Sequence, residues 1–132
     1  MKQALNIYSL EVEVSLGVNP EEKLHPQTVL IDLQIDMGAK DVSSRDHITD
    51  TIDYAQMVAV IRQSSMVRHF NLIESLGGYL VDVLRATFCL QAGELRVTKP
   101  GCIPGAYGSA YQIRFGDIID PGFKSCGKKP TR

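Results

Sequence analysis

Apolar and polar side chains alternate along two stretches in the first third of the chain. Residues 5–16 place their apolar set at Leu10, Val12, Val14 and Leu16. Residues 28–37 do the same at Val29, Ile31, Leu33, Ile35 and Met37. A period of two is typical of a strand with one buried and one solvated face. Because residues 17–27 contain glycine and proline, we expect a loop that joins two antiparallel strands.

A helical spacing replaces this alternation in the middle of the chain. The first predicted helix has its apolar positions at Tyr54, Met57, Val58 and Ile61. Asp50 or Thr51 is expected to cap its start. The polar stretch 62–69 is expected to end it loosely.

A second helix is predicted from residue 71 to residue 88. Asn71 and Glu74 have the spacing of a capping box, and apolar positions recur every three or four residues as far as Phe88. Gly77 and Gly78 interrupt this pattern and cost about 1 kcal/mol each relative to alanine. We therefore expect the backbone there to approach another element closely.

Two more strands are predicted after the helices. Residues 94–98 and 110–115 alternate again, and Pro100, which cannot donate to a sheet, is expected to end the first of them by Lys99. The element order ββααββ predicts an α+β domain, with two helices on one face of an antiparallel four-stranded sheet. The two free edges of such a sheet favour a homo-oligomer.

Length and charge narrow the class of protein. A chain of 132 residues fits one domain, which we expect over residues 1–116, with a disordered tail over 117–132. The formal charge of -1 argues against nucleic acid or an anionic membrane as partner. No signal peptide or membrane-spanning run is found, and the three cysteines are widely spaced. We expect a cytoplasmic location, and the spacing of histidines and cysteines predicts no metal site.

Polar residues gather at the predicted element ends in short motifs. They are Gly17-Val-Asn-Pro-Glu-Glu22, Asp50-Thr-Ile-Asp-Tyr54, Asn71-Leu-Ile-Glu74, Thr98-Lys99-Pro-Gly and Ile103-Pro-Gly-Ala-Tyr107. With these motifs in this order, the chain resembles the dihydroneopterin aldolases of folate biosynthesis from about Leu5 to Phe115. The resemblance implies the tunnelling fold, whose ββααββ subunits assemble as rings of four that close into a barrel and often stack as octamers. It also implies a small-molecule site between neighbouring subunits.

The resemblance implies that Glu74 anchors the pterin ring. A carboxylate accepts the ring N–H and the neighbouring amino group together, and the first turn of a helix favours its negative charge. Backbone groups at Leu72 and Ile73 are expected to help hold the ring. On local sequence alone, a capping partner of Asn71 is the favoured role for Glu74.

Further side chains are implied at the same site. Tyr54 of the adjacent subunit would lie against the pterin with its hydroxyl near the reacting carbons, although by itself it could be a core aromatic. Thr51 and Ile52 would present backbone groups nearby. Val18 would supply apolar contact to the ring.

The catalytic residues that the resemblance implies are Lys99, Tyr54 and Glu22. Glu22 would bind the hydroxyls of the substrate side chain, and Lys99, with a lowered pKa, would take the proton of the 2′-hydroxyl. Because the C=N bond of 7,8-dihydroneopterin accepts the released electron pair, neither a Schiff base, a metal nor a cofactor is expected. Glycolaldehyde and 6-hydroxymethyl-7,8-dihydropterin are the expected products, with 2′-epimerase activity as a side reaction.

Two alternatives stay open. One is the epimerase of the same fold that acts on dihydroneopterin triphosphate, against which Thr98-Lys99-Pro-Gly and the lack of extra cationic residues near the predicted side-chain pocket argue. The other is a non-catalytic, oligomeric pterin-binding module, which would keep Glu74 but could lose Glu22 and Lys99. Both of these residues are present.

Overall fold

The computed structural model describes residues 3–38, 46–48 and 52–116. Its elements follow the predicted ββααββ order, with a short 3₁₀ helix in the first loop. They are β1 (Gln3–Val14), η1 (Pro20–Lys23), β2 (Gln27–Gly38), α1 (Tyr54–Ser65), α2 (Ile73–Phe88), β3 (Gly93–Pro100) and β4 (Gly108–Phe115).

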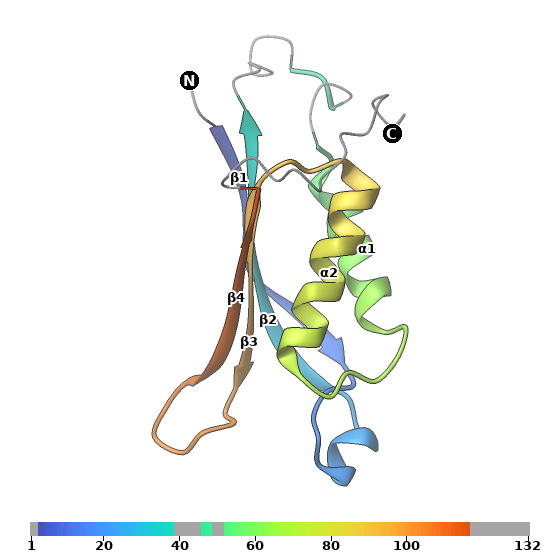
Figure 1. The fold of residues 1–132 in the computed structure, drawn as a ribbon, viewed down its shortest axis with the longest axis vertical. Coiled ribbons are helices and arrows are strands. Elements are labelled where there is room, and N and C mark those ends of the chain that lie inside the picture. Colours follow the sequence, from blue (N-terminus) through green and yellow to red (C-terminus); the bar gives the residue numbers. More distant parts are fainter. Residues whose placement is uncertain (1–2, 39–45, 49–51, 117–132) are drawn as a thin grey trace.

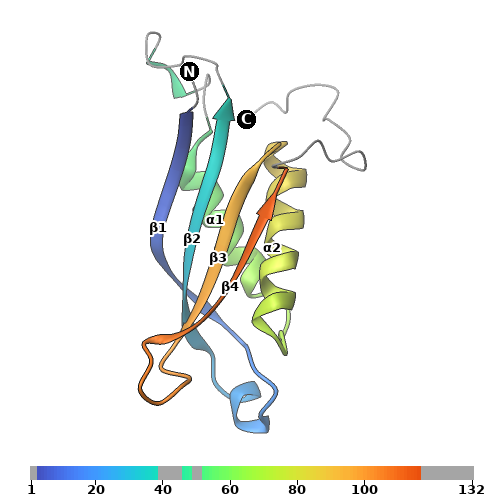
Figure 2. The same cartoon turned by 60° about the vertical axis from the view of Figure 1, so that its left-hand side comes forward.

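The four strands form one antiparallel sheet in the order β1-β2-β3-β4. Both helices lie on the same face of this sheet (Figure 1), and none of the described helices or strands covers the opposite face (Figure 2). The predicted fold class is therefore confirmed. Among the residues that the structure describes, neither helix is long and apolar enough to cross a membrane.

The core lies between the sheet and the two helices. Every second residue of β2 is buried there, at Val29, Ile31, Leu33 and Ile35. The helices bury Met57, Ile61, Leu76, Leu80 and Leu84 against them. The period of two and the helical spacing thus place apolar side chains on facing surfaces.

A β-bulge interrupts β1 where the alternation changes phase. Between Ile7 and Leu10, β1 has one residue more than β2. Ser9 takes φ 51, and its N–H donates to Oδ1 of Asp32 over 2.9 Å. Because the extra residue shifts the phase of the pleat, Ile7 before the bulge and Val12 after it both pack against the core.

α1 is capped by Asp53 and not by Asp50 or Thr51 as predicted. The Asp53 side chain accepts a hydrogen bond from Ala55 N over 3.0 Å. An aspartate at the N-cap satisfies a backbone donor of the first turn. Asp50 and Thr51 lie outside the described residues.

α1 ends within the polar stretch 62–69, as predicted. Its last residue is Ser65, and the last two serines, Ser64 and Ser65, are buried. The Ser65 hydroxyl donates to the carbonyl of Ile61 over 2.7 Å, which satisfies the buried hydroxyl within the helix.

The capping box predicted between Asn71 and Glu74 is wrong. The N-cap of α2 is Leu72, and no side chain makes a cap hydrogen bond there. Since Asn71 lies before the N-cap, Glu74 falls at the second helical position and does not reach back as a cap partner. Its carboxylate stays in the first turn, exposed.

The third strand is longer than predicted. β3 includes Lys99 and Pro100, which pair with Ser109 and Gly108 of β4. A proline in the last position of a strand removes only one donor and interrupts no later ladder bond. Lys99 is thereby held by strand pairing at the very end of the sheet.

The close approach predicted at the glycine pair is confirmed for Gly77 alone. A Cβ built on Gly77 would lie 2.8 Å from Cδ2 and 3.0 Å from Cε2 of Tyr111, whereas a Cβ on Gly78 would meet nothing within 4 Å. Gly77 therefore lets α2 lie directly on the ring of Tyr111 in β4.

We expect alanine to have opposite effects at these two positions. Gly78→Ala should raise the free energy of unfolding by up to about 1 kcal/mol, because it adds helix propensity at no steric cost. Gly77→Ala gains the same propensity but must displace the Tyr111 ring, and overpacking costs about 1–3 kcal/mol. Thermal and urea unfolding of the two variants checks this, and a Gly77→Ala protein as stable as Gly78→Ala would refute the close packing.

Candidate active site

Three segments that are distant in sequence meet at one end of the sheet. They are the loop between β1 and β2 with η1, the end of β3, and the start of α2 (Figures 1 and 2). A parallel bridge between Leu16 and Phe70 joins the first segment to the chain that enters α2. Sites are commonly built at such element ends, because a rigid scaffold holds the polar residues of the loops.

Glu22 and Lys99 form an ion pair at this end. Lys99 Nζ donates to Oε2 of Glu22 over 2.6 Å, and about a fifth of each side chain is exposed, 20% for Lys99 and 22% for Glu22. The two residues are 77 positions apart in the chain. The structure thus brings together the predicted acid and the predicted base.

Backbone and side-chain donors fix the Glu22 carboxylate from other directions. Oε1 accepts from the backbone N–H of Asn19 over 3.2 Å, and Oε2 accepts from Nε2 of Gln27 over 3.3 Å. Gln27 Nε2 also donates to the carbonyl of Leu16 over 2.7 Å. The Lys99 ammonium, then the Asn19 and Gln27 donors, lower the pKa of Glu22 below its ordinary value, since each favours the charged carboxylate.

Gly17 provides the space in which this carboxylate lies. It adopts φ +126, and a Cβ built on it would be 2.0 Å from Oε1 of Glu22. Only glycine combines that backbone conformation with the missing side chain. The loop motif that begins at Gly17 therefore positions Glu22 by leaving room for it.

Glu74 lies in the first turn of α2, and its side chain is exposed. The first N–H groups of a helix have no intrahelical acceptor, which leaves those of Ile73 and Glu74 available beside the carboxylate. Leu72, at the N-cap, is also exposed. This arrangement presents a carboxylate next to backbone donors and an apolar side chain, which suits a flat polar ring.

Tyr54 is separated from these residues within one chain. It is the first residue of α1, and α1 and α2 run in opposite directions, so Tyr54 lies at the other end of the helix layer (Figure 1). A helix of 12 residues is about 18 Å long. The side chain of Tyr54 is 61% exposed, so it is not the core aromatic that was considered as an alternative.

The remaining predicted residues differ in how they are presented. Val18 is 65% exposed and directly follows Gly17. Ile52 is partly buried and packs against the core near the start of α1. Thr51 lies outside the described residues.

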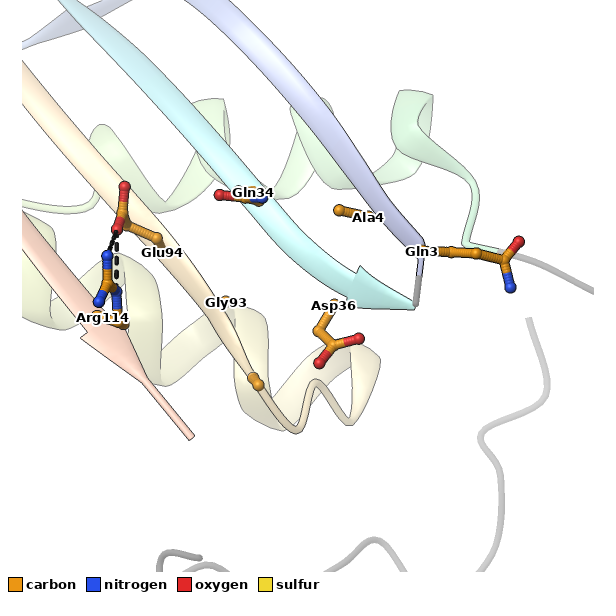
Figure 3. Close-up of a pocket in the computed structure, with 8 residues that line it drawn as sticks. Gln3, Ala4, Gln34, Asp36, Gly93, Glu94 and Arg114 are labelled. Atoms are coloured by element: carbon orange, nitrogen blue, oxygen red, sulfur yellow. Dashed lines mark hydrogen bonds and ion pairs between the residues drawn. The ribbon is translucent and has the colours of Figure 1, made fainter. Parts of the chain in front are cut away.

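A hollow of about 340 Å³ lies at the opposite end of the sheet and contains none of the predicted site residues. It is lined mainly by polar side chains, among them Gln34, Asp36 and the ion pair of Glu94 with Arg114 (Figure 3). Of the residues predicted to bind substrate, Glu74, Leu72 and Val18 are exposed in the single chain. In residues 3–38, 46–48 and 52–116, no group of three or more His, Cys, Asp and Glu lies close enough to hold a metal ion.

Two polar residues that support the site were not predicted from sequence. Gln27 sits at the start of β2 and braces Glu22. His69 contacts Ser15 and Gly17 through its two ring nitrogens. The contacts of His69 are more than 50 positions apart in sequence, so no local spacing indicated them, whereas Gln27 lies only five residues after Glu22.

Comparison with known proteins gives a consistent family. A family model described as "FolB: Dihydroneopterin aldolase" matches residues 5–114. A protein of Chlamydia muridarum named "Probable dihydroneopterin aldolase" is 32% identical over 99 residues, which cover 72% of this chain and 80% of that protein.

Solved structures show the same fold. The E. coli dihydroneopterin aldolase in complex with neopterin superposes with a TM-score of 0.81 at 21% identity, covering 86% of this chain and 99% of that one. The Burkholderia thailendensis dihydroneopterin aldolase bound to guanine superposes with a TM-score of 0.70 at 20% identity, covering 86% and 89%.

Gly17→Ala is expected to break the Glu22–Lys99 pair. The new methyl group would occupy the position of the carboxylate, so the pKa of Glu22 should rise toward the ordinary range of a glutamate. Because the folded-state pKa is depressed, the pair stabilises the protein above the ordinary glutamate pKa, and this is lost as pH falls through the folded-state value. The stability of the variant should therefore no longer fall through loss of this pair at low pH. ¹³C NMR titration of the side-chain carboxyls measures the pKa of Glu22, and unfolding at several pH values measures the stability.

Gly38→Ala is the matched control for this substitution. Gly38 also has a left-handed φ, +70, but a Cβ there would meet nothing within 4 Å. In both variants, backbone strain should lower the free energy of unfolding by about 1 kcal/mol or more. Only Gly17→Ala should change the titration of Glu22. An unchanged Glu22 in Gly17→Ala would contradict the role assigned to Gly17.

Proposed function

The chain belongs to the dihydroneopterin aldolase family, and from this premise we propose that Lys99, Tyr54 and Glu22 cleave the side chain of 7,8-dihydroneopterin. The products are 6-hydroxymethyl-7,8-dihydropterin and glycolaldehyde, as an aldolase of folate biosynthesis would release them. The observation that carries the assignment of residues is the 2.6 Å pair of Lys99 and Glu22 beside the start of α2. We propose that the enzyme is cytoplasmic.

The pterin ring binds at the start of α2 in this proposal. The Glu74 carboxylate accepts two hydrogen bonds from the ring N–H and the amino group, a bidentate contact stronger than two separate neutral ones. The backbone groups at Leu72 and Ile73 complete the polar edge, and Val18 covers one side of the ring. The exposure of Glu74, Leu72 and Val18 in the single chain supports this, since nothing in the described part of the chain covers them.

Glu22 and Lys99 then face the substrate side chain. Hydroxyl groups of the side chain donate to Glu22 and replace Lys99 there, which frees the lysine for proton transfer. A base takes the 2′-hydroxyl proton, the C1′–C2′ bond breaks, and its electron pair moves into the C=N bond of the ring. Glycolaldehyde leaves, and the carbon that remains on the ring is protonated with the help of Tyr54.

This route requires neither a Schiff base nor a metal. The electron pair is accepted by the substrate itself, so Lys99 acts on protons alone. Re-addition of glycolaldehyde in the other orientation would invert the 2′ carbon, and we propose this 2′-epimerisation as a minor activity.

We propose that the site is shared between subunits of a ring of four, which closes into a barrel and stacks into an octamer in some members of the family. Tyr54 lies a helix length away from Glu74 in its own chain, so an aromatic must come from a neighbour. The outer strands β1 and β4 end the sheet, and pairing them between subunits would satisfy their free backbone groups. Thr51 and Ile52, which lead into Tyr54, would line the same side of the site.

The charges near Glu22 favour a substrate with a neutral side chain. A triphosphate would meet a carboxylate whose pKa is already lowered, and the nearest ammonium, Lys99, is engaged by that same carboxylate. The negative charges of a triphosphate and of the Glu22 carboxylate would repel each other. The epimerase of dihydroneopterin triphosphate is therefore the weaker candidate.

Lys99→Ala should lower kcat for 7,8-dihydroneopterin by 10²-fold or more, which is roughly the range for loss of a general base. The assay follows 6-hydroxymethyl-7,8-dihydropterin by chromatography and fluorescence. Lys23→Ala is the matched control, because Lys23 is an exposed lysine of η1 next to Glu22 in sequence. Borohydride added with substrate should leave the enzyme active, and covalent trapping at Lys99 would mean a Schiff-base aldolase instead.

A mixing experiment tests the shared site. Tyr54→Ala and Glu74→Gln should each be nearly inactive, but co-assembled subunits should regain roughly a quarter of wild-type activity, because random pairing restores that share of the interfaces. Mixing Glu22→Gln with Glu74→Gln should restore nothing, since both defects lie on the same side of the site. Recovery in the second mixture, or none in the first, would contradict the assignment of Tyr54 to the neighbouring subunit.

A further inference from the structure

His69 lies between the two segments that carry Glu22 and Glu74, and it has no part in the proposed chemistry. We propose that His69 is a positioning residue that fixes the distance between the carboxylate for the ring and the carboxylate for the side-chain hydroxyls. The inference rests on the proposed function, because that function gives the two carboxylates their roles. The half-buried imidazole is held at both of its nitrogens.

The hydrogen bonds of the ring define its protonation when it is neutral. Nε2 lies 2.7 Å from the carbonyl oxygen of Gly17, which only accepts, so Nε2 carries the proton. Nδ1 lies 2.5 Å from Oγ of Ser15 and accepts from that hydroxyl. A single ring thus holds two alternate residues of the segment after β1, on either side of Leu16.

Backbone bonds between the same segments are few. Phe70 N–H donates to the carbonyl of Ser15, and Gly17 N–H donates to the carbonyl of Phe70, both over 2.9 Å. These two bonds form one isolated bridge, between Leu16 and Phe70, which is not part of a longer strand pair. The two contacts of His69 therefore double the number of hydrogen bonds that join the segments.

The first segment leads directly to Glu22. Gly17 forms the surface against which the carboxylate of Glu22 lies, and the Leu16 carbonyl holds Gln27, which in turn donates to Glu22. A displacement of residues 15–17 would therefore move the acid and its ion pair with Lys99.

The second segment leads as directly to Glu74. Phe70 is fully buried and anchors the chain, Leu72 is the N-cap of α2, and Glu74 stands in its first turn. Only four residues separate His69 from Glu74. His69 therefore couples the positions of the two carboxylates, which must bind opposite parts of one substrate.

This coupling predicts a selective defect in His69→Ala. The value of kcat/KM for 7,8-dihydroneopterin should fall by about 10- to 100-fold, since a displacement of about 1 Å at a reacting centre costs that much. The Kd of guanine, which offers only the ring edge to Glu74, should change by less than about threefold, because one carboxylate suffices to hold a ring. His69→Gln, whose amide keeps a donor for the Gly17 carbonyl, should recover most of the loss.

A double-mutant cycle separates positioning from general loss of structure. If His69 acts through Glu22, His69→Ala should lower kcat/KM much less in a Glu22→Gln background than in the wild type, because the effects of coupled residues are not additive. Additive effects, an equal loss of guanine binding, or a kcat/KM for His69→Ala within twofold of wild type would overturn the proposal. All rates are expressed per folded protein, and Glu21→Gln serves as the control for the charge change.

A readout without substrate distinguishes failure of this inference from failure of the proposed function. In His69→Ala, ¹³C NMR titration of Glu22 should show its pKa closer to the ordinary glutamate range, as the ion pair with Lys99 loosens. If wild-type protein does not convert 7,8-dihydroneopterin but this shift appears, the proposed function is wrong and the positioning role of His69 stands. If wild-type protein is active and the Glu22 titration is unchanged by His69→Ala, the positioning role is wrong.

Discussion

Burial of one face of the sheet is the constraint from which the rest of the molecule follows. Four antiparallel strands turn alternate apolar residues to the same side, and both helices cover that side. Burying an apolar side chain contributes about 1.5–3 kcal/mol, so the layers cannot slide without large loss. With the layers fixed, the strand ends and helix ends that carry polar residues are fixed as well, and they gather at one end of the domain.

The polar residues at that end illustrate how a site is divided between chain segments. Gly17 leaves the space in which the Glu22 carboxylate lies. Lys99, then Asn19 and Gln27, lower the pKa of this carboxylate. Lys99 is held in turn by pairing of the last residues of β3 with β4. Such a carboxylate is bound from several sides before any substrate arrives, and preorganised groups of this kind lose little freedom on binding.

An incomplete cluster in one chain is itself informative about assembly. Glu74 is exposed and Glu22 and Lys99 are partly exposed, whereas Tyr54 lies at the far end of the helix layer. In the proposed site, a second chain supplies the aromatic side. The proposed assembly would also cover the edge strands β1 and β4, so one interface would both complete the site and pair the free edges of the sheet.

The sequence by itself determined the element order, the apolar faces and the identity of the residues at the strand ends, because periodicity and local motifs are short-range properties. It also indicated the family. It misplaced the caps of both helices and the end of β3, since several Asp, Thr and Asn residues compete for each cap and strand pairing carried Lys99 and Pro100 into the sheet. Only the tertiary structure decided that Glu22 pairs with Lys99, that Gly77 rests on Tyr111, and that His69 binds both Ser15 and Gly17. Each of these contacts links residues more than 30 positions apart, and such contacts exist only after the chain has folded.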